Sequence, residues 1–335
     1  MKKKLAYFLV TSDNIAFAAG NVALSLNKYM PNKEYDILVY HSDLQEKNLK
    51  TLKKIPHVIT HHFRLNDDFV SYMLGENGLP KNGRWNDVNS LLCLAHYEIF
   101  SLLDSYEKVI WLDVDMSIQA DITLLETYGP FGMALDIAGN HVFTAKDQFL
   151  TNVEGYDLSQ SAHISACIVV TDKLKNYKEI YQYCYEKTKI YASILKNPDQ
   201  AIIELAIRDF GLTVNNVPWK EFVCHSTHEY AALASIVHFG FINKPWNNSR
   251  LLQSFPEWFR THLVWLSLGG ADFNRDDIST CSVYVELQKL ENKLCEQMNS
   301  ENYKAANSIR WCLKELKGLI IQRIKERRIG KLHFK

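Results

Sequence analysis

Residues 108–115 read KVIWLDVD, a short apolar run that ends in two aspartates separated by one residue. The apolar part predicts a buried strand. Side chains two apart on an extended backbone point the same way, so the carboxylates of Asp113 and Asp115 face one point beyond the end of the strand. Ligands of open α/β sheets bind outside the carboxyl ends of the strands. This stretch therefore predicts a binding site at the edge of a sheet.

Strand-like and helix-like patterns alternate along most of the chain. The expected strands are residues 5–10, 35–40, 58–63, 108–112, 131–137 and 164–170. The expected helices are residues 15–29, 44–52, 88–103, 173–191 and 198–209. This alternation predicts an α/β fold in which helices cover both faces of a mostly parallel central sheet. The polar, glycine-containing residues 66–86 are expected to form a long loop.

The pattern changes after residue 246, where strand signals decline and helical ones increase. We therefore expect an α/β domain over residues 1–250 and a helical extension over residues 251–302. Residues 303–335 carry ten Lys and Arg side chains against two acids, a formal charge of +8. Apolar residues recur there every three or four positions, at Ile309, Leu313, Leu316, Ile320 and Ile324.

This basic amphipathic pattern predicts a tail that associates with an anionic membrane surface. A helix packed on the domain with a solvated basic face is the alternative. Because residues 1–302 must then carry −8, the zero net charge of the chain conceals an acidic body and a basic tail.

Composition excludes several classes of protein. The chain has 38 Lys+Arg and 38 Asp+Glu among its 335 residues, which argues against a generally basic nucleic-acid binder, so no nucleic-acid partner is expected. Seven scattered cysteines without a CxxC pair indicate neither a disulfide framework nor a zinc ribbon and favour a reducing cytoplasm. The apolar run at residues 5–10 is too short for a signal peptide. No stretch approaches the roughly 18 apolar residues of a spanning helix.

A second polar feature, HFGFINKPW over residues 238–246, can complete a metal site. Two adjacent carboxylates repel, and a hard divalent cation is the usual way to keep both ionised. His238 offers a further ligand, and Lys244 offers a point charge suited to a diphosphate. Taken alone, the two aspartates also fit a pair of solvated turn carboxylates.

The order of these motifs resembles that of the retaining glycosyltransferases of family 8, which include glycogenin and bacterial lipopolysaccharide galactosyltransferases and glucosyltransferases. The resemblance covers about residues 5–250. The matching segments are residues 8–14, 108–115 and 165–170, the pair Asp199-Gln200, and His238 with Lys244, Pro245 and Trp246. It implies a GT-A fold, the α/β arrangement that binds nucleotide-diphospho-sugars.

The resemblance also implies a role for each matching residue. Asp113, Asp115 and His238 would hold Mn²⁺ or Mg²⁺. The residues implied to bind the UDP-sugar donor are Thr11, Ser12, Asp13, Asn14, His96, Val114 and Lys244. Within this set, residues 11–14 would cradle uracil and ribose, and Lys244 would hold the diphosphate. Asp136, Asp199 and Gln200 would face the donor sugar and are the implied catalytic residues.

Several positions depart from the family pattern. His96 stands where the family usually has an arginine that touches the donor. This weakens the implied grip on the donor unless Arg84 or Lys81 takes over that contact. Phe241 replaces a glycine, and residues 165–167 read SAC where the family usually has Asn-Ala-Gly. Ala201 and Glu204 replace an acid and an amide. These departures leave the identity of the donor sugar open.

The implied reaction is metal-dependent, retaining transfer of a hexose from UDP-glucose or UDP-galactose to a lipopolysaccharide core or another surface glycan. Same-face attack through an oxocarbenium-like state is expected, with the acceptor proton passing to the leaving phosphate. The enzyme is expected in the cytoplasm, on the inner face of the plasma membrane.

Two other functions remain open at this point. A catalytically weak module that binds sugar nucleotides or glycans would keep the fold without turnover. A haloacid-dehalogenase-like phosphatase would use Asp113 as nucleophile, with residues 269–272, GGAD, imitating its second acidic motif.

Overall fold

A computed structural model of the chain describes residues 2–80, 88–138, 141–240 and 244–273. Contacts divide the chain into two compact units, residues 1–245 with 255–273, and residues 246–254 with 274–335. The predicted tail, residues 303–335, lies outside the described residues, as do residues 274–302 of the predicted extension and Lys81, Arg84 and Phe241. In the second unit the described part contains the short helix α8 (Ser249–Ser254).

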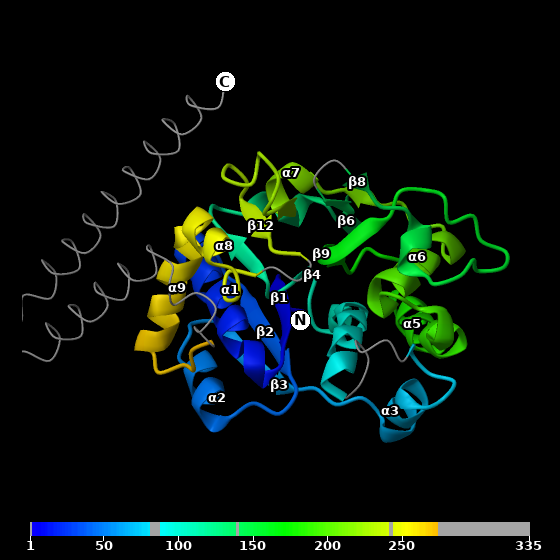
Figure 1. The fold of residues 1–335 in the computed structure, drawn as a ribbon, viewed down its shortest axis with the longest axis horizontal. Coiled ribbons are helices and arrows are strands. Elements are labelled where there is room, and N and C mark those ends of the chain that lie inside the picture. The colour runs from blue at the N-terminus through cyan, green and yellow to red at the C-terminus, as the bar shows by residue number, and fades with distance from the viewer. Residues whose placement is uncertain (1, 81–87, 139–140, 241–243, 274–335) are drawn as a thin grey trace, which may run out of the picture. The chain divides into compact units, whose positions relative to one another are not determined.

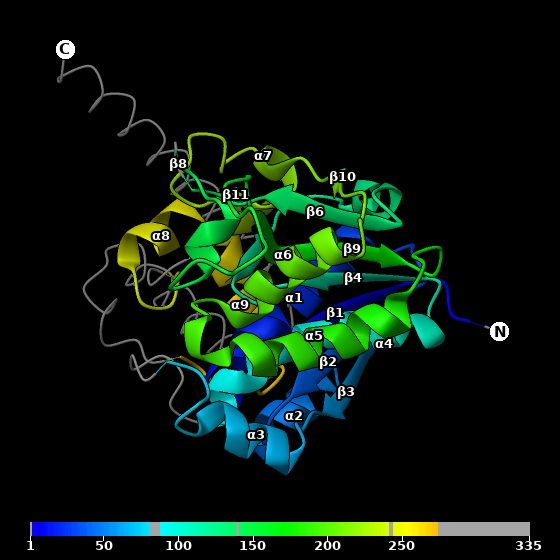
Figure 2. The same ribbon diagram turned by 90° about the vertical axis from the view of Figure 1, so that its right-hand side faces the viewer.

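The central sheet of the first unit has the strand order β10-β6-β9-β4-β1-β2-β3 (Figure 2). Its strands are β1 (Ala6–Thr11), β2 (Asp36–His41), β3 (Val58–His62), β4 (Lys108–Leu112), β6 (Phe131–Leu135), β9 (His163–Thr171) and β10 (Asn215–Asn216). β1 pairs in parallel with β2 and β4, whereas β9 is antiparallel to β4 and β6. The predicted α/β fold with a mostly parallel sheet is confirmed.

A smaller sheet follows the carboxyl end of β4. The chain leaves β4, passes through residues 113–115 and enters β5 (Met116–Ile118). β5 pairs antiparallel with β12 (Ile236–His238), which pairs with β11 (Cys224–His225). A further two-stranded hairpin joins β7 (Ile137–Ala138) to β8 (His141–Val142). The end of β4 is therefore bordered by a second sheet.

Helices cover both faces of the central sheet, as predicted. The helices of the first unit are α1 (Ala16–Tyr29), α2 (Glu46–Leu52), α3 (Asp67–Leu74), α4 (Glu98–Ser101), α5 (Tyr177–Tyr191), α6 (Pro198–Asp209), α7 (Trp219–Phe222) and α9 (Pro256–Ser267). α1 and α9 lie on one side of the sheet, and α4, α5 and α6 lie on the other (Figures 1 and 2).

The prediction of a long loop over residues 66–86 is wrong in its first part, which forms helix α3. The side chain of Asn66 caps this helix by accepting hydrogen bonds from the backbone N–H groups of Asp68 and Phe69, at 2.9 and 3.3 Å. Phe69 and Met73, four residues apart, are buried. Two buried side chains are enough to hold this short helix, because most helical stability in proteins comes from packing against the core. Residues 81–87 lie outside the described residues.

The single helix predicted over residues 88–103 is mainly a 3-10 helix, Val88–Tyr97, followed by the short α4 and a final 3-10 turn. Leu91, Leu94 and Tyr97 are fully buried and lie three residues apart. A 3-10 helix places residues i and i+3 directly above one another. The three-residue spacing of these core side chains is compatible with the tighter winding.

Helix α9 belongs to the first unit, which differs from the predicted boundary at residue 250. Its Trp265 is fully buried and lies against α1 at Gly20. A Cβ atom at Gly20 would lie 2.2 Å from Cε3 of Trp265, so the indole ring fills the space that a side chain would need. Helix–helix packing through a glycine thus extends the α/β domain to residue 273.

Replacing Gly20 by alanine should destabilise the protein although alanine is the better helix former. The helix preference favours Gly20→Ala by about 1 kcal/mol. Overpacking against Trp265 costs about 1–3 kcal/mol, so we expect a net loss of about 1 kcal/mol in the free energy of unfolding. Urea unfolding measures this loss, and the double variant Gly20→Ala/Trp265→Leu shows whether it depends on the indole ring. If Gly20→Ala is as stable as wild type in both backgrounds, α9 does not pack as described.

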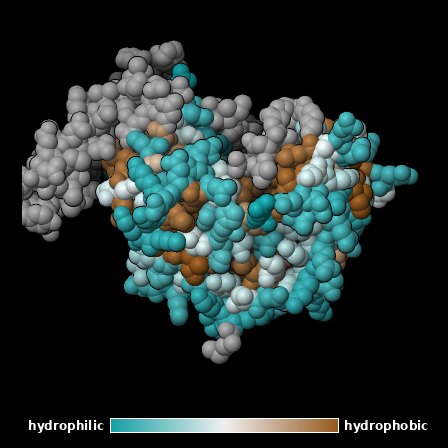
Figure 3. Space-filling model, turned by 90° about the horizontal axis from the view of Figure 1, so that it is seen from below, coloured by the Kyte–Doolittle hydropathy of each residue, from teal (hydrophilic) through white to brown (hydrophobic). Residues whose placement is uncertain are grey.

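Hydrophilic residues predominate on the face of the molecule shown in Figure 3, with hydrophobic residues in several patches between them. Among the described residues, no helix has both the length and the apolar character needed to span a membrane.

Candidate active site

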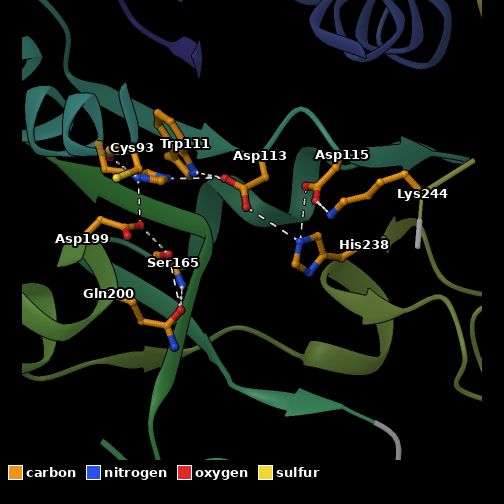
Figure 4. A network of polar contacts seen from close by, with 10 residues as sticks. Cys93, Trp111, Asp113, Asp115, Ser165, Asp199, Gln200, His238 and Lys244 are labelled. Atoms are coloured by element: carbon orange, nitrogen blue, oxygen red, sulfur yellow. Dashed lines mark hydrogen bonds and ion pairs between the residues drawn. The ribbon is translucent and has the colours of Figure 1, made fainter. Parts of the chain in front are cut away.

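Three potential metal ligands converge at the carboxyl end of β4. Asp113 and Asp115 follow the strand directly, and the antiparallel pairing of β5 with β12 sets His238 opposite Met116. The Nε2 atom of His238 lies 3.7 Å from Oδ2 of Asp113 and 3.3 Å from Oδ1 of Asp115 (Figure 4). One ligand atom from each of the three residues lies within 4.8 Å of the others. The three side chains can therefore hold one metal ion together.

A lysine and a histidine lie beside the same carboxylates. The Nζ atom of Lys244 contacts Oδ2 of Asp115. Burial alone would raise the pKa of Asp115, but the charges and hydrogen bonds of His238 and Lys244 hold this pKa well below its ordinary value. Burial alone would lower the pKa of His238, but Asp115 and Asp113 raise it. This end of the sheet thus keeps the carboxylate of Asp115 ionised and places a lysine ammonium beside it.

His96 is a buried neighbour of the predicted metal ligand Asp113 and is only 6% exposed. Its Nδ1 lies 3.0 Å from Oδ2 of Asp199, and its Nε2 lies 3.4 Å from Oδ1 of Asp113. Burial alone would lower the pKa of His96, but the two carboxylates raise it to about 9. Trp111 donates from Nε1 to the same Oδ1 of Asp113 at 3.0 Å. His96 therefore joins a predicted metal ligand to a predicted catalytic residue, rather than facing open solvent.

The three predicted catalytic residues are connected through Ser165, whose backbone N–H donates to Oε1 of Gln200 at 3.5 Å. Ser165 donates from its hydroxyl to Oδ2 of Asp199 at 2.9 Å. Gln200 donates from Nε2 to Oδ2 of Asp136 at 2.7 Å. Burial raises the pKa of Asp136, although the hydrogen bond from Gln200 opposes the shift. A polar chain thus runs from β9 and α6 to Asp136, just beyond β6.

The predicted nucleoside turn borders a cleft of about 730 Å³. Ser12, Asp13 and Asn14 line one wall, and Ala271 and Asp272 line another part. β1, which precedes this turn, pairs in parallel with β4. The cleft and the metal ligands therefore follow the carboxyl ends of two neighbouring strands.

Some of the residues predicted to bind the UDP-sugar donor are more buried than the motif implies. Thr11 is fully buried and Val114 is 8% exposed. Oδ1 of Asp13 accepts from the backbone N–H of Gln45 at 2.7 Å and from Nδ2 of Asn48 at 2.9 Å. The carboxylate of Asp13 thus ties the turn to the start of α2. Ser12 and Asn14 line the same cleft.

The family model described as Glycosyl transferase family 8 matches residues 7–250. The chain belongs to glycosyltransferase family 8. Galactosyltransferase LgtC, solved in complex with donor and acceptor sugar analogues, is similar in fold: the TM-score is 0.58 at 16% identity, over 80% of this chain and 97% of LgtC. The bifunctional glycosyltransferase WbbM gives a TM-score of 0.55 at 16% identity, over 86% of this chain and 52% of WbbM. None of the curated proteins compared with the chain matches it.

Family membership sets the phosphatase alternative aside. The resemblance to family 8 found in the sequence is confirmed over residues 7–250. The GGAD segment at residues 269–272 follows helix α9. It lines the cleft beside the nucleoside turn through Ala271 and Asp272.

The unusual Glu204 of this family 8 glycosyltransferase has a structural role. Its carboxylate is 1% exposed and accepts from Nδ1 of His163 at 3.0 Å and from Nη1 of Arg208 at 2.7 Å. It also accepts from the backbone N–H of His163 at 2.5 Å. Glu204 therefore fastens α6, which carries Asp199 and Gln200, to the start of β9.

Sequence reasoning missed two polar residues of the site. Ser165 was noted only as a departure from the family pattern, and the structure places its hydroxyl on Asp199. Gln148, 2% exposed, donates from Nε2 to Oδ2 of Asp136 at 3.4 Å. Gln148 stands in no motif, so its sequence carries no local signal. Only the approach of its 3-10 turn, Ala145–Gln148, to β6 reveals it.

Proposed function

We propose that this glycosyltransferase transfers a hexose from a UDP-sugar with retention of configuration and with the help of a divalent cation. The observation that carries the proposal is the convergence of Asp113, Asp115, His238 and Lys244 at the end of β4. The cleft beside residues 12–14 offers room for a nucleoside at the neighbouring strand. Diphosphate and nucleoside would thus be bound at adjacent strand ends, as ligands of open α/β sheets are.

The donor set fits a divalent cation such as Mn²⁺ or Mg²⁺. Asp113 and Asp115 supply carboxylate oxygens and His238 supplies an imidazole nitrogen, all within 4.8 Å. Carboxylates suit Mg²⁺ and Mn²⁺, and the imidazole favours the transition metal of the two. A bound cation would offset negative charge on the diphosphate leaving group. Lys244 adds a second positive charge at the same place.

The buried polar chain would orient the donor sugar. Asp199 is held by His96 and Ser165, and Asp136 is held by Gln200. Groups locked by such contacts lose little freedom when a substrate binds. We assign the positioning of the sugar to Asp199, Asp136 and Gln200. The acceptor hydroxyl would attack on the same face as the leaving group, and its proton would pass to the leaving phosphate.

The donor hexose is proposed as glucose or galactose, and the acceptor as a lipopolysaccharide core or another surface glycan. Support comes from LgtC, which is a galactosyltransferase solved with donor and acceptor sugar analogues. Turnover of UDP-glucose compared with UDP-galactose distinguishes the two donors.

Calorimetric titration of UDP with and without Mn²⁺ tests the proposed donor and cation together. We expect UDP affinity to rise at least tenfold with Mn²⁺, because two carboxylates and a histidine then share a counter-charge with the diphosphate. UDP release from UDP-glucose and UDP-galactose in the presence of acceptor measures turnover. Metal-independent UDP binding would contradict the metal role, and binding without turnover across the panel would favour the binding-module alternative.

We also propose that residues 303–335 attach the enzyme to the inner face of the plasma membrane, where it would meet a lipid-linked acceptor. The support is the +8 charge and apolar spacing of this segment. Deleting residues 303–335 should abolish sedimentation with vesicles containing anionic lipid and leave transfer to a soluble acceptor unchanged. Attraction of about 1 kcal/mol per basic residue near the surface makes the expected loss large. Equal vesicle binding by the truncated protein would refute the attachment.

A further inference from the structure

Residues 269–273 form a strap that is tied to two helices of the first unit. Trp265 on α9 donates from Nε1 to the backbone oxygen of Ala271 at 2.8 Å. The backbone N–H of Ala271 donates to Oδ1 of Asn48 on α2 at 3.0 Å. A Cβ at Gly270 would lie 2.0 Å from Cε2 of Trp265, so only glycine lets the strap pass this close to the indole. The path of the strap is therefore set by packing and by hydrogen bonds on both sides.

The strap carries one carboxylate, that of Asp272, which contacts a buried histidine. Nε2 of His262 lies 2.7 Å from Oδ1 of Asp272, and His262 is fully buried. The imidazole stacks on Trp258 with ring centroids 5.5 Å apart and planes 10° apart. The side chain of Asp272 stays 35% exposed and lines the cleft. A rigid aromatic base thus holds Asp272 at the cleft wall.

The other acids of this cleft differ from Asp272. Asp13 uses its carboxylate to bind Gln45 and Asn48. The side chain of Asp43 is fully exposed, at 100%. Asp272 differs from both because its side chain is 35% exposed while its partner, His262, is a fully buried imidazole. Its negative charge disfavours phosphate at this end of the cleft, whereas Lys244 favours it beside the metal ligands.

We propose that Asp272 accepts a hydrogen bond from the nucleoside of the donor and so helps to select it, an inference that rests on the proposed UDP-sugar function. Uracil offers an N–H group and ribose offers hydroxyls, and an ionised carboxylate is an acceptor only. Such a charge-assisted bond is stronger than a neutral one. The donor site of this glycosyltransferase then extends beyond residues 7–250, the part that the family model matches.

Binding of UDP and of pyrophosphate, each with Mn²⁺, separates this role from a general effect on the site. Asp272→Ala should weaken UDP binding about tenfold or more and leave pyrophosphate binding unchanged. Asp272→Asn should weaken it less, because the amide oxygen still accepts. Glu46→Gln, which removes an exposed acid on α2 that pairs with Lys50, is the matched control and should bind both ligands as wild type does.

Analogues of UDP identify the group that Asp272 recognises. With 2′-deoxy-UDP, 3′-deoxy-UDP and N3-methyl-UDP, the loss caused by Asp272→Ala should disappear for the analogue that lacks the bonded N–H or O–H. His262→Phe should also weaken UDP binding selectively, since His262 positions the carboxylate. Thermal melting of each variant verifies that the fold persists.

Four results would overturn the inference: UDP binding by Asp272→Ala equal to wild type, an equal loss for pyrophosphate, a loss that persists with all three analogues, or no binding of UDP by the wild type. The last result also removes the proposed UDP-sugar function. Wild-type UDP binding together with an unaffected Asp272→Ala variant removes this inference alone.

Discussion

Asp113→Asn is expected to lower the rate of sugar transfer by about a thousandfold, the upper range for loss of one electrostatic contact in an active site. The variant removes a charge from the group of Asp113, Asp115 and His238 while keeping an oxygen that can accept from Nε1 of Trp111. The fold should therefore survive. UDP release at increasing Mn²⁺ measures the loss, and thermal melting verifies the fold.

The opposite end of the same strand supplies the control. Glu107 precedes β4 and pairs with Lys4 on the surface, so Glu107→Gln removes a charge without touching the site. Its transfer rate should equal that of the wild type. If Asp113→Asn retains full activity while chelation of metal still abolishes it, the cation is bound elsewhere and the assignment of these ligands is wrong.

Glu204→Ala is expected to lower the free energy of unfolding by about 3 kcal/mol, as loss of one partner from a buried charged group does. The carboxylate accepts from both His163 and Arg208 and is 1% exposed. Alanine leaves the side chains of both partners without this acceptor and leaves a gap between α6 and β9. Urea unfolding at pH 7 measures the loss, and Glu186→Gln on the exposed side of α5 is the control.

The same residue should make stability depend on acid. Burial alone would raise the pKa of Glu204, but His163 and Arg208 hold it below its ordinary value of 4.5. A depressed folded-state pKa adds stability that is fully present above 4.5 and is lost as the pH falls through the folded value. Glu204→Gln should therefore be less stable than wild type at pH 7, and the difference should shrink below pH 4.5. A constant difference down to pH 3 would contradict this.

Periodicity explains which elements could be predicted. The apolar run of residues 108–112 and the helical spacing of residues 15–29 are local patterns, and each yields the element expected. Helix α3 was missed because its stripe of buried residues is narrow, with polar residues between. The 3-10 helix Val88–Tyr97 was predicted as an α-helix because apolar residues three and four apart fit both windings.

The sequence by itself determined the fold class and the family, and it predicted the candidate site residues. Asp113 and Asp115 directly follow the apolar run that forms β4, and this order is a local property of the sequence. The tertiary structure alone decided that His96 contacts the carboxylates of Asp113 and Asp199, that Glu204 fastens α6 to β9, and that Asp272 lines the cleft. These contacts join positions far apart in the chain. They depend on strand register and helix packing, which leave no periodic signal around either partner.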